Sequence, residues 1–334
     1  MDEKTKPKTS RLLEKAILLG GTDIHLCPRA KPFVRINGNL QALENHILSV
    51  EHLEELIAEL LDSRQISDLH KFRMLSFTFA INNLGRFRSS IYSQRGSFAI
   101  TIRSMPHTIP NFETMGLPPE IKDIMARNRG LVLVVGIGSI KSTTLASLLD
   151  VVNQERTCHI TTVEDPIEYL HRHGKSIVSQ KEIGGDTTDF QTGLTWSMRE
   201  DPDIIMLSEM PQEPEIIMQM LTVAEEKLVL VGLNAIGTTK AIEYVIDAFS
   251  SPTQKEAVTE KQAQVRSRLA GVLECIIYQQ LLPYEGDSGL SPSCELLILT
   301  NETKRLIADG RFHSLNSKLE RMDKRGGQHA DSRK

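Results

Sequence analysis

Cysteine is scarce in this chain, and the few cysteines are scattered along it. The 334 residues contain four, Cys27, Cys158, Cys275 and Cys294, and no two of them stand in a CxxC arrangement. A disulfide framework or a zinc site needs cysteines at closer, patterned spacing. We therefore interpret all four as free thiols of a protein in a reducing compartment.

Long apolar runs and an excess of one charge are also missing. The longest apolar run, around residues 131–137, is far too short to span a bilayer, and the charged start MDEKTKPKTSRLLEK lacks the apolar core of a signal peptide. The net charge is only −4, so the molecule as a whole does not attract nucleic acid. With 40% hydrophobic and 25% charged residues, we predict a cytoplasmic globular protein long enough for two domains.

The first 105 residues predict a small α+β domain. Apolar residues at helical spacing fill residues 9–18 and 50–62. Alternating apolar residues predict a hairpin with its turn at Asn37-Gly38, and three further strands between residues 75 and 105. The turns between these three strands are predicted at Asn82-Asn83 and Arg95-Gly96.

A second domain, with a different pattern of predicted strands and helices, follows a linker. Residues 106–113 contain two prolines and no periodicity, which is typical of a linker. In residues 114–316 strands alternate with helices, which predicts an α/β fold with a mainly parallel sheet. The predicted strands are 131–135, 158–163, 203–207 and 228–233, and the predicted helices lie near 142–153, 188–199, 213–224, 238–248 and 254–281. Residues 317–334 are polar, and we predict that they are disordered.

The stretch LVLVVGIGSIKSTTLASLLD, residues 131–150, is typical of a strand, a phosphate-binding loop and a helix. Glycines in such a loop let backbone N–H groups point at a phosphate, and the helix N-terminus adds its dipole. A lysine then reaches the β- and γ-phosphates, and the next hydroxyl holds magnesium. The candidate phosphate-binding residues are Gly136, Gly138, Ser139, Lys141, Ser142 and Thr143, and Ser142 is also a candidate Mg²⁺ ligand.

This loop departs from the pattern G-x-x-x-x-G-K-[ST]. Four residues instead of five separate Gly136 from Lys141, and Ile140 stands where the pattern has glycine. A β-branched residue in a left-handed position is strained by about 1–2 kcal/mol or more. We therefore expect a strained phosphate-binding loop with altered geometry. Two other interpretations stay open: a dinucleotide fingerprint G-x-G-x-x-G that lacks its third glycine, and an ordinary strand-to-helix turn.

Six sequence blocks carry a resemblance to a known family. In chain order they are GGTDIHL, GRFRSSIYSQRGSFAITIRSM, HITTVEDPIEYLHRH, SQKEIG, SMREDPDIIMLSEM and TNETKRLIADGRFHSL. Over roughly residues 10–316 the chain resembles the pilus-retraction motors PilT and PilU, within the type II/type IV secretion ATPases. The resemblance implies a PAS-like N-terminal domain, a RecA-like P-loop domain, and ATP with Mg²⁺ as ligands. It also implies a cytoplasmic hexameric ring beneath an inner-membrane platform protein, where ATP hydrolysis drives disassembly of pilin filaments.

The resemblance assigns roles to two carboxylates and three arginines. Glu164, in TTVEDPIE, matches the glutamate that polarises the attacking water, and Glu209 matches the Walker B acid that organises Mg²⁺. Carboxylates directly after a strand suit these tasks on chemical grounds as well. Arginines of the segment that holds Arg88, Arg95 and Arg103 reach a neighbouring subunit's phosphates in the family. A guanidinium suits this role because its planar fork binds phosphate oxygens in pairs.

Other positions of the nucleotide motifs differ from the family. Ser208 replaces the glycine before the Walker B acid, and Pro211 stands in the stretch that continues as MRD in the family. Asn234 replaces the histidine that senses the γ-phosphate; an asparagine can donate a hydrogen bond but cannot carry a proton charge. Because the surrounding apolar pattern is intact, we expect the motor architecture with weakened or lost nucleotide chemistry.

Two hypotheses of different classes follow. The leading one is a divergent pilus-retraction motor subunit that hydrolyses ATP; retention of Lys141, Glu164 and Glu209 favours it. The alternative is a non-hydrolysing ring member or adaptor of a pilus or type II secretion machine, which forms a ring with itself or with a paralogous ATPase. Ile140 and the shortened loop favour the alternative. A nucleic-acid-translocating relative is disfavoured by the acidic net charge and the lack of interleaved aromatic and basic residues.

Overall fold

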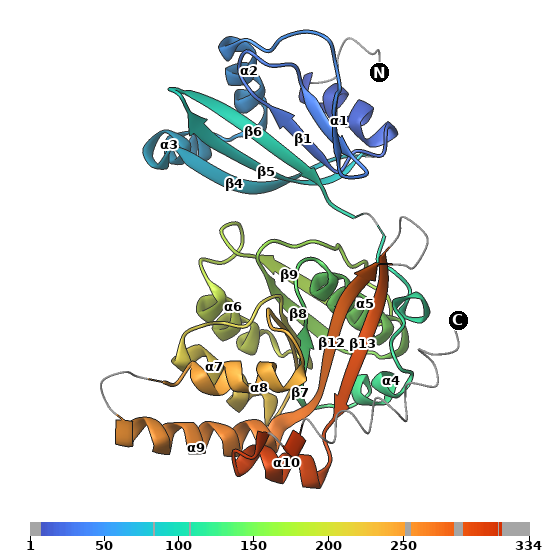
Figure 1. Ribbon diagram of the computed structural model, residues 1–334, viewed down its shortest axis with the longest axis vertical. Coiled ribbons are helices and arrows are strands. Elements are labelled where there is room, and N and C mark those ends of the chain that lie inside the picture. The colour runs from blue at the N-terminus through green and yellow to red at the C-terminus, as the bar shows by residue number, and fades with distance from the viewer. Residues whose placement is uncertain are drawn as a thin grey trace. The chain divides into compact units, whose positions relative to one another are not determined.

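The computed structural model describes residues 8–82, 84–106, 108–250, 255–283, 290–312 and 314–315. The chain forms two compact units that divide between Thr108 and Ile109, inside the predicted linker (Figure 1). Two predictions, the turn residue Asn83 and the disordered tail 317–334, lie outside the described residues. Within the described ranges, no helix combines the length and the apolar character that crossing a membrane requires.

The first unit is an antiparallel sheet with helices packed on it. The helices are α1 (Lys8–Leu18), α2 (Val50–Leu60) and α3 (Ser63–Phe72), and the strands are β1 (Asp23–Leu26), β2 (Phe33–Ile36), β3 (Asn39–Ala42), β4 (Met74–Ile81), β5 (Gly85–Gln94) and β6 (Ser97–Ser104). The strands pair in the order β3-β2-β1-β6-β5-β4. Alternate residues of the central strands, such as Phe87 and Ile102, share a buried core with Leu13 of α1 and Leu53 of α2. The predicted hairpin turn is confirmed, with left-handed φ angles of 48° at Asn37 and 83° at Gly38.

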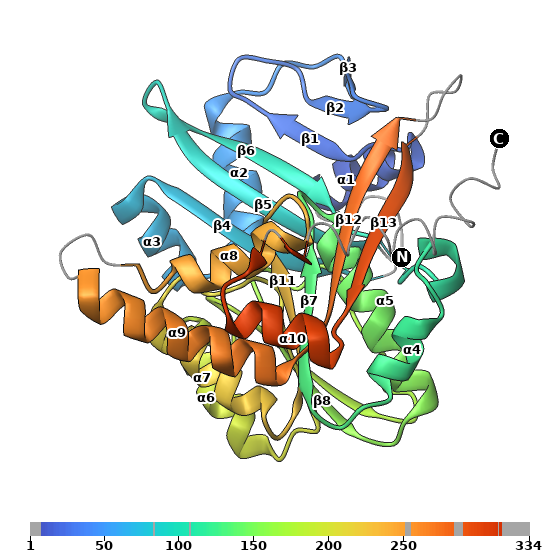
Figure 2. The same ribbon diagram turned by 60° about the horizontal axis from the view of Figure 1, so that its bottom comes forward.

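The second unit is a seven-stranded sheet covered by helices on both faces (Figure 2). Its strands are β7 (Gly130–Val135), β8 (His159–Glu164), β9 (Ile177–Glu182), β10 (Ile204–Leu207), β11 (Leu228–Leu233), β12 (Leu273–Pro283) and β13 (Leu290–Ile298). Its α-helices are α4 (Glu120–Met125), α5 (Ile140–Glu155), α6 (Phe190–Ser197), α7 (Pro214–Ala224), α8 (Thr238–Asp247), α9 (Lys255–Val272) and α10 (Asn301–Ala308), with short 3-10 helices at Phe112–Met115 and Met198–Glu200. One face packs against α4 and α5, through Ile121 and Leu148 for example, and the other packs against α6 to α10.

The strand order places four loops at one edge of this sheet. The order is β13-β12-β7-β11-β10-β8-β9, and all neighbours are parallel except β12 and β13. Strand β11 therefore lies between β7 and β10, with Leu233 opposite Val135 and Val231 opposite Leu207. Because the carboxyl ends of parallel strands meet at the same edge, the loops after β7, β11, β10 and β8 are neighbours there.

The predicted α/β architecture is confirmed, but the predicted helix 254–281 is wrong. Helix α9 ends at Val272, and the residues from Leu273 onward form β12, parallel to β7. A short apolar run is compatible with a buried helix or a buried strand, and the β-branched pair Ile276-Ile277 favours the strand. Elements α3, α4, α10, β9 and β13 were not predicted. Phe112, assigned to the linker, is buried in the core of the second unit.

Candidate nucleotide-binding site

The turn from β7 to α5 leaves three backbone N–H groups without a partner inside the helix. The first hydrogen bond of α5 runs from the Thr143 N–H to the Ser139 carbonyl oxygen, at 3.1 Å. The N–H groups of residues 140–142 precede it and therefore have no helical acceptor. No side chain caps this end of the helix. The free N–H groups and the helix dipole together suit an anion.

The backbone strain expected at Ile140 is wrong. Ile140 is the first residue of α5 and does not adopt a positive φ; the left-handed position falls on Gly138, with φ of +74°. The Ile140 side chain is only 6% exposed, and its Cγ2 lies 3.0 Å from where a Cβ would stand at Gly136. That Cβ would also lie 2.8 Å from the Gln279 carbonyl oxygen. Ile140 therefore fills the space beside Gly136 and does not distort the backbone.

Lys141 is buried, and its ammonium group is held within the protein. Its Nζ donates to the Asn234 Oδ1 at 2.5 Å and to the Gly138 carbonyl oxygen at 3.2 Å. The Asn234 Nδ2 donates to the Glu209 Oε1 at 3.5 Å, so the asparagine bridges Lys141 and Glu209, the predicted Walker B acid. Burial lowers the pKa of Lys141, although Glu209 and Glu168 oppose this by attraction. The bonds to Asn234 and Gly138 use two of the three ammonium donors, so a phosphate that takes more than the third has to displace one of these oxygens.

Glu164, the predicted water-polarising residue, ends β8 and is 6% exposed. Its Oε1 accepts hydrogen bonds from the Thr162 Oγ1 at 2.6 Å and from the Gln180 Nε2 at 3.0 Å. Thr162 is opposite Gln180 in the pairing of β8 with β9, and it shares a face of β8 with Glu164. The carboxylate is therefore anchored from two neighbouring strands.

Ser208, which replaces a family glycine, has a partner of its own. Its N–H donates to the Val163 carbonyl oxygen at 3.0 Å, and its Oγ accepts from the Asp165 N–H at 3.1 Å. These bonds tie the start of the Glu209 loop to the end of β8. On the other side, Gly232 of β11 approaches so closely that a Cβ there would lie 2.1 Å from the Ser208 carbonyl oxygen.

The three predicted arginines lie in the first unit. Arg88 on β5 is directly opposite Arg103 on β6, and Arg95 occupies the left-handed position of the β5–β6 turn, with φ of 48°. The Arg103 Nε donates to the Asp23 Oδ1 at 2.7 Å. Burial raises the pKa of the Asp23 carboxyl group, but hydrogen bonds from Arg103 and Thr22 outweigh it and hold this pKa below its usual value. All three guanidinium groups are exposed, and their contact with a nucleotide stays a prediction.

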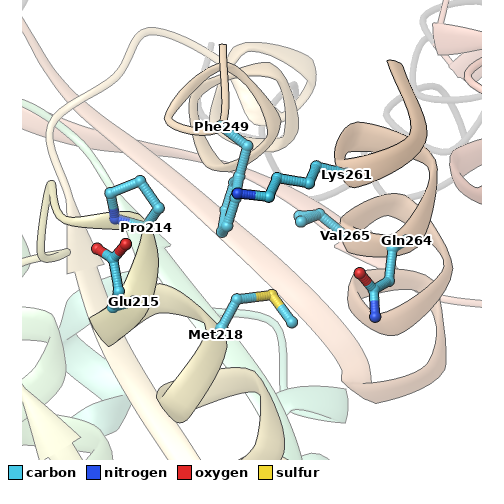
Figure 3. Close-up of a pocket in the computed structure, with 7 residues that line it drawn as sticks. All are labelled: Pro214, Glu215, Met218, Phe249, Lys261, Gln264 and Val265. Carbon is cyan, nitrogen blue, oxygen red and sulfur yellow. The ribbon is translucent and has the colours of Figure 1, made fainter. Parts of the chain in front are cut away.

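A groove of about 370 Å³ lies elsewhere on the second unit (Figure 3). It is lined by Met218 of α7, Phe249 after α8, and Lys261 and Val265 of α9, among others. None of the predicted nucleotide-binding residues contributes to it. The groove is therefore not the phosphate site.

Comparison with known proteins decides the family. Residues 2–310 match the family of type II/IV secretion system proteins. The chain belongs to this family. It is 32% identical over 313 residues to the type IV pilus retraction ATPase PilT of Pseudomonas aeruginosa, across 93% of this chain and 88% of PilT. It is 30% identical over 322 residues to the type IV pilus ATPase PilU of the same organism, across 96% of this chain and 82% of PilU.

The fold of this family member matches a solved relative. A crystal structure of the pilus retraction motor PilT with bound ADP aligns with a TM-score of 0.86 and 36% identity, over 94% of this chain and 90% of that chain. The resemblance inferred from the sequence is therefore confirmed, as is an N-terminal domain followed by a RecA-like ATPase domain.

The residues at the sheet edge fit a nucleoside triphosphate with Mg²⁺. Unpaired helix N–H groups and the Lys141 ammonium group supply donors for phosphate oxygens. Ser142, in the first turn of α5, and the exposed Glu209 supply oxygen atoms of the kind that Mg²⁺ prefers. When bound, the metal ion would neutralise phosphate charge.

Three contacts of the site were missed by sequence reasoning. They are the bridge from Asn234 to Lys141, the bond from Gln180 to Glu164, and the bond between the Tyr169 OH and the Thr143 Oγ1 at 2.8 Å. Gln180 lies in the block SQKEIG, which carried the resemblance but no assigned role. The order of the strands, which local sequence patterns do not encode, brings these side chains together.

Proposed function

We propose that this chain is a divergent pilus-retraction motor subunit that binds ATP with Mg²⁺ and hydrolyses it. The observation that carries the proposal is that three groups follow or end parallel strands at the same edge of one sheet: Lys141 in the first turn of the helix after β7, Glu209 after β10, and Glu164 at the end of β8. These are the three groups that phosphate binding, metal organisation and water activation need.

In this proposal each group has one task. The N–H groups of residues 140–142, which have no helical acceptor, and the Lys141 ammonium group bind the phosphates. Ser142 and Glu209 hold Mg²⁺, and Glu164 orients the water and takes up its proton. Arg88, Arg95 and Arg103 of a neighbouring subunit neutralise charge on the γ-phosphate.

The resemblance to PilT and PilU supports a ring of six subunits, formed by this chain alone or together with a paralogous ATPase. Such a ring works in the cytoplasm against an inner-membrane platform protein and disassembles pilin filaments. Nucleic acid is not part of this proposal, because the net charge of the chain is −4.

A second candidate, a non-hydrolysing ring member, is supported by the contact between Lys141 and Asn234. The ammonium group already makes two hydrogen bonds inside the protein, so a phosphate that needs more than its third donor has to compete with them. A subunit in which Lys141 rarely leaves Asn234 for a phosphate oxygen would assemble in the ring without hydrolysing ATP.

Phosphate release by the purified full-length chain separates the two candidates. The motor predicts steady release with ATP and Mg²⁺, abolished by Lys141→Ala and by Glu164→Gln, while a fluorescent ATP analogue still binds to Glu164→Gln. The adaptor predicts no release above that of Lys141→Ala. Release that survives in Lys141→Ala would point to a contaminating enzyme and would contradict the proposed site.

A further inference from the structure

A hydrogen-bonded glutamine of β9 lies directly against Glu164. The Gln180 Nε2 donates to the Glu164 Oε1 at 3.0 Å and to the Tyr169 carbonyl oxygen at 2.8 Å. The Gln180 Oε1 accepts from the His171 N–H at 2.8 Å. Both amide protons and the amide oxygen of Gln180 are therefore engaged.

These partners fix which way the amide group points. A backbone N–H can only donate, so the atom that faces His171 has to be the oxygen of the amide. The NH₂ group must then face Glu164, where an oxygen would repel the carboxylate. Gln180 thus presents a donor of fixed position to one carboxylate oxygen, beside the second donor, Thr162.

The segment between β8 and β9 is itself tied to the phosphate loop. The Thr143 hydroxyl donates its one proton to the Ser139 carbonyl oxygen at 3.0 Å, so the Tyr169 OH must be the donor in its 2.8 Å bond to Thr143. Burial raises the pKa of Tyr169, which keeps the phenol protonated for this role. The first turn of α5 is therefore connected through Tyr169 and Gln180 to Glu164.

We propose that Gln180 is a positioning residue for Glu164, and that it sets the direction in which this carboxylate faces the attacking water. This inference rests on the proposed ATPase function. A proton acceptor must lie within about 2.6–3.2 Å of the water that it activates, so a rotated carboxylate loses turnover without losing nucleotide binding. Both N–H donors of the Gln180 amide are already used inside the protein, so this group has none left for a phosphate oxygen.

Two substitutions of different character test the role. Gln180→Glu can still accept from the His171 N–H but replaces the donor to Glu164 with an acceptor. Gln180→Met keeps the length of the side chain and removes every hydrogen bond. Gln219→Glu and Gln219→Met are the matched controls, because the Gln219 Nε2 of α7 donates to the Thr195 hydroxyl at 3.2 Å in an exposed bond.

Both Gln180 variants should lower kcat about 10- to 100-fold, the scale on which loss of an orienting partner acts, with the affinity for the ATP analogue changed less than about 2-fold. The Gln219 controls should keep kcat. Unchanged kcat in Gln180→Glu would overturn the inference. So would a rise in KM with kcat unchanged, or a loss of kcat that only follows the fraction of unfolded protein in thermal melts.

A structural readout separates this inference from the proposed function. If the wild-type chain releases no phosphate, hydrolysis is refuted, and crystal structures of the wild type and Gln180→Met still decide the positioning role. The inference expects the Glu164 carboxylate to turn away from Thr162 in Gln180→Met. A carboxylate that keeps its wild-type rotamer and its bond to Thr162 would overturn it.

Discussion

Replacing Ile140 with glycine should have opposite effects on folding and on nucleotide binding. The side chain is 6% exposed, so its removal forfeits about 1.5–3 kcal/mol of burial. Glycine in the first turn of α5 adds up to about 1 kcal/mol. The free energy of unfolding should therefore fall by about 2–4 kcal/mol, which lowers Tm by roughly 5–15 °C for a unit of this size. Urea denaturation and thermal melts of the full chain measure both quantities.

Ile137 offers a matched control within the same loop. It is 67% exposed, so Ile137→Gly removes the same atoms but should cost less than about 1 kcal/mol. Equal losses in the two variants, or a loss below about 1 kcal/mol in Ile140→Gly, would refute the packing of Ile140 against Gly136.

The predicted effect on ATP binding is tested with a loop that is restored to the common phosphate-binding pattern. Glycine at position 140 together with one inserted residue restores the common pattern and clears the space beside Gly136. Affinity for ATP, titrated with a fluorescent analogue, should rise about 10-fold or more, equivalent to about 1.4 kcal/mol. Unchanged affinity in the repaired variant would show that Ile140 and the loop length do not limit phosphate binding.

Three further outcomes follow from single contacts. Asn234→Ala removes a hydrogen-bond acceptor of Lys141 and should tighten ATP binding about 10-fold, because a hydrogen bond to a charged group contributes about 1.5–3 kcal/mol. Weaker binding of ATP in a titration would contradict this. Gly232→Ala places a Cβ 2.1 Å from the Ser208 carbonyl oxygen and should lower the free energy of unfolding, measured by urea denaturation, by about 3 kcal/mol. A loss under about 1 kcal/mol would refute the close approach. Asp23→Asn should cost about 1 kcal/mol or less at pH 7, because Arg103 is largely exposed to solvent. Since the folded-state pKa of Asp23 is lowered, this difference should shrink as the pH falls below 3.8 and stay constant above it, as acid titration of stability can check.

The parallel core of the second unit could be predicted because its strands are continuous apolar runs. LVLVV at residues 131–135 lies between two glycines, and the apolar part of DIIML at residues 203–207 lies between Asp203 and Ser208; both runs are too short for helices. Strand β12 was missed because its apolar residues directly follow a helical segment, and Gly271, two residues before the strand, was not taken as a sign that the helix ends. Strand β9, IVSQKE, has too few apolar residues to indicate a strand; it lies at the edge of the sheet, where only β8 pairs with it.

The sequence motifs predicted which residues belong to the candidate nucleotide-binding site, but they did not predict the hydrogen-bond partners of those residues. Lys141, Glu164 and Glu209 were assigned because each follows or ends a strand in a recognisable block. The partner of Lys141 depends on β11 lying between β7 and β10, a long-range pairing that no local pattern contains. The strain expected at Ile140 was wrong because a shorter loop starts the helix one residue earlier, where a right-handed φ suits isoleucine.

The replaced residues of the nucleotide motifs each make specific contacts, which argues for a site adjusted as a whole. Ser208 accepts the Asp165 N–H, Ile140 packs against Gly136, and the amide of residue 234 bonds the loop lysine. Loss of function without compensation would leave such side chains without partners. Here they make contacts within the protein, where two of the three donors of the Lys141 ammonium group are bonded. We expect the apparent affinity for ATP to fall in proportion to the fraction of molecules in which the bond between Lys141 and Asn234 is open, so this contact should weaken nucleotide binding.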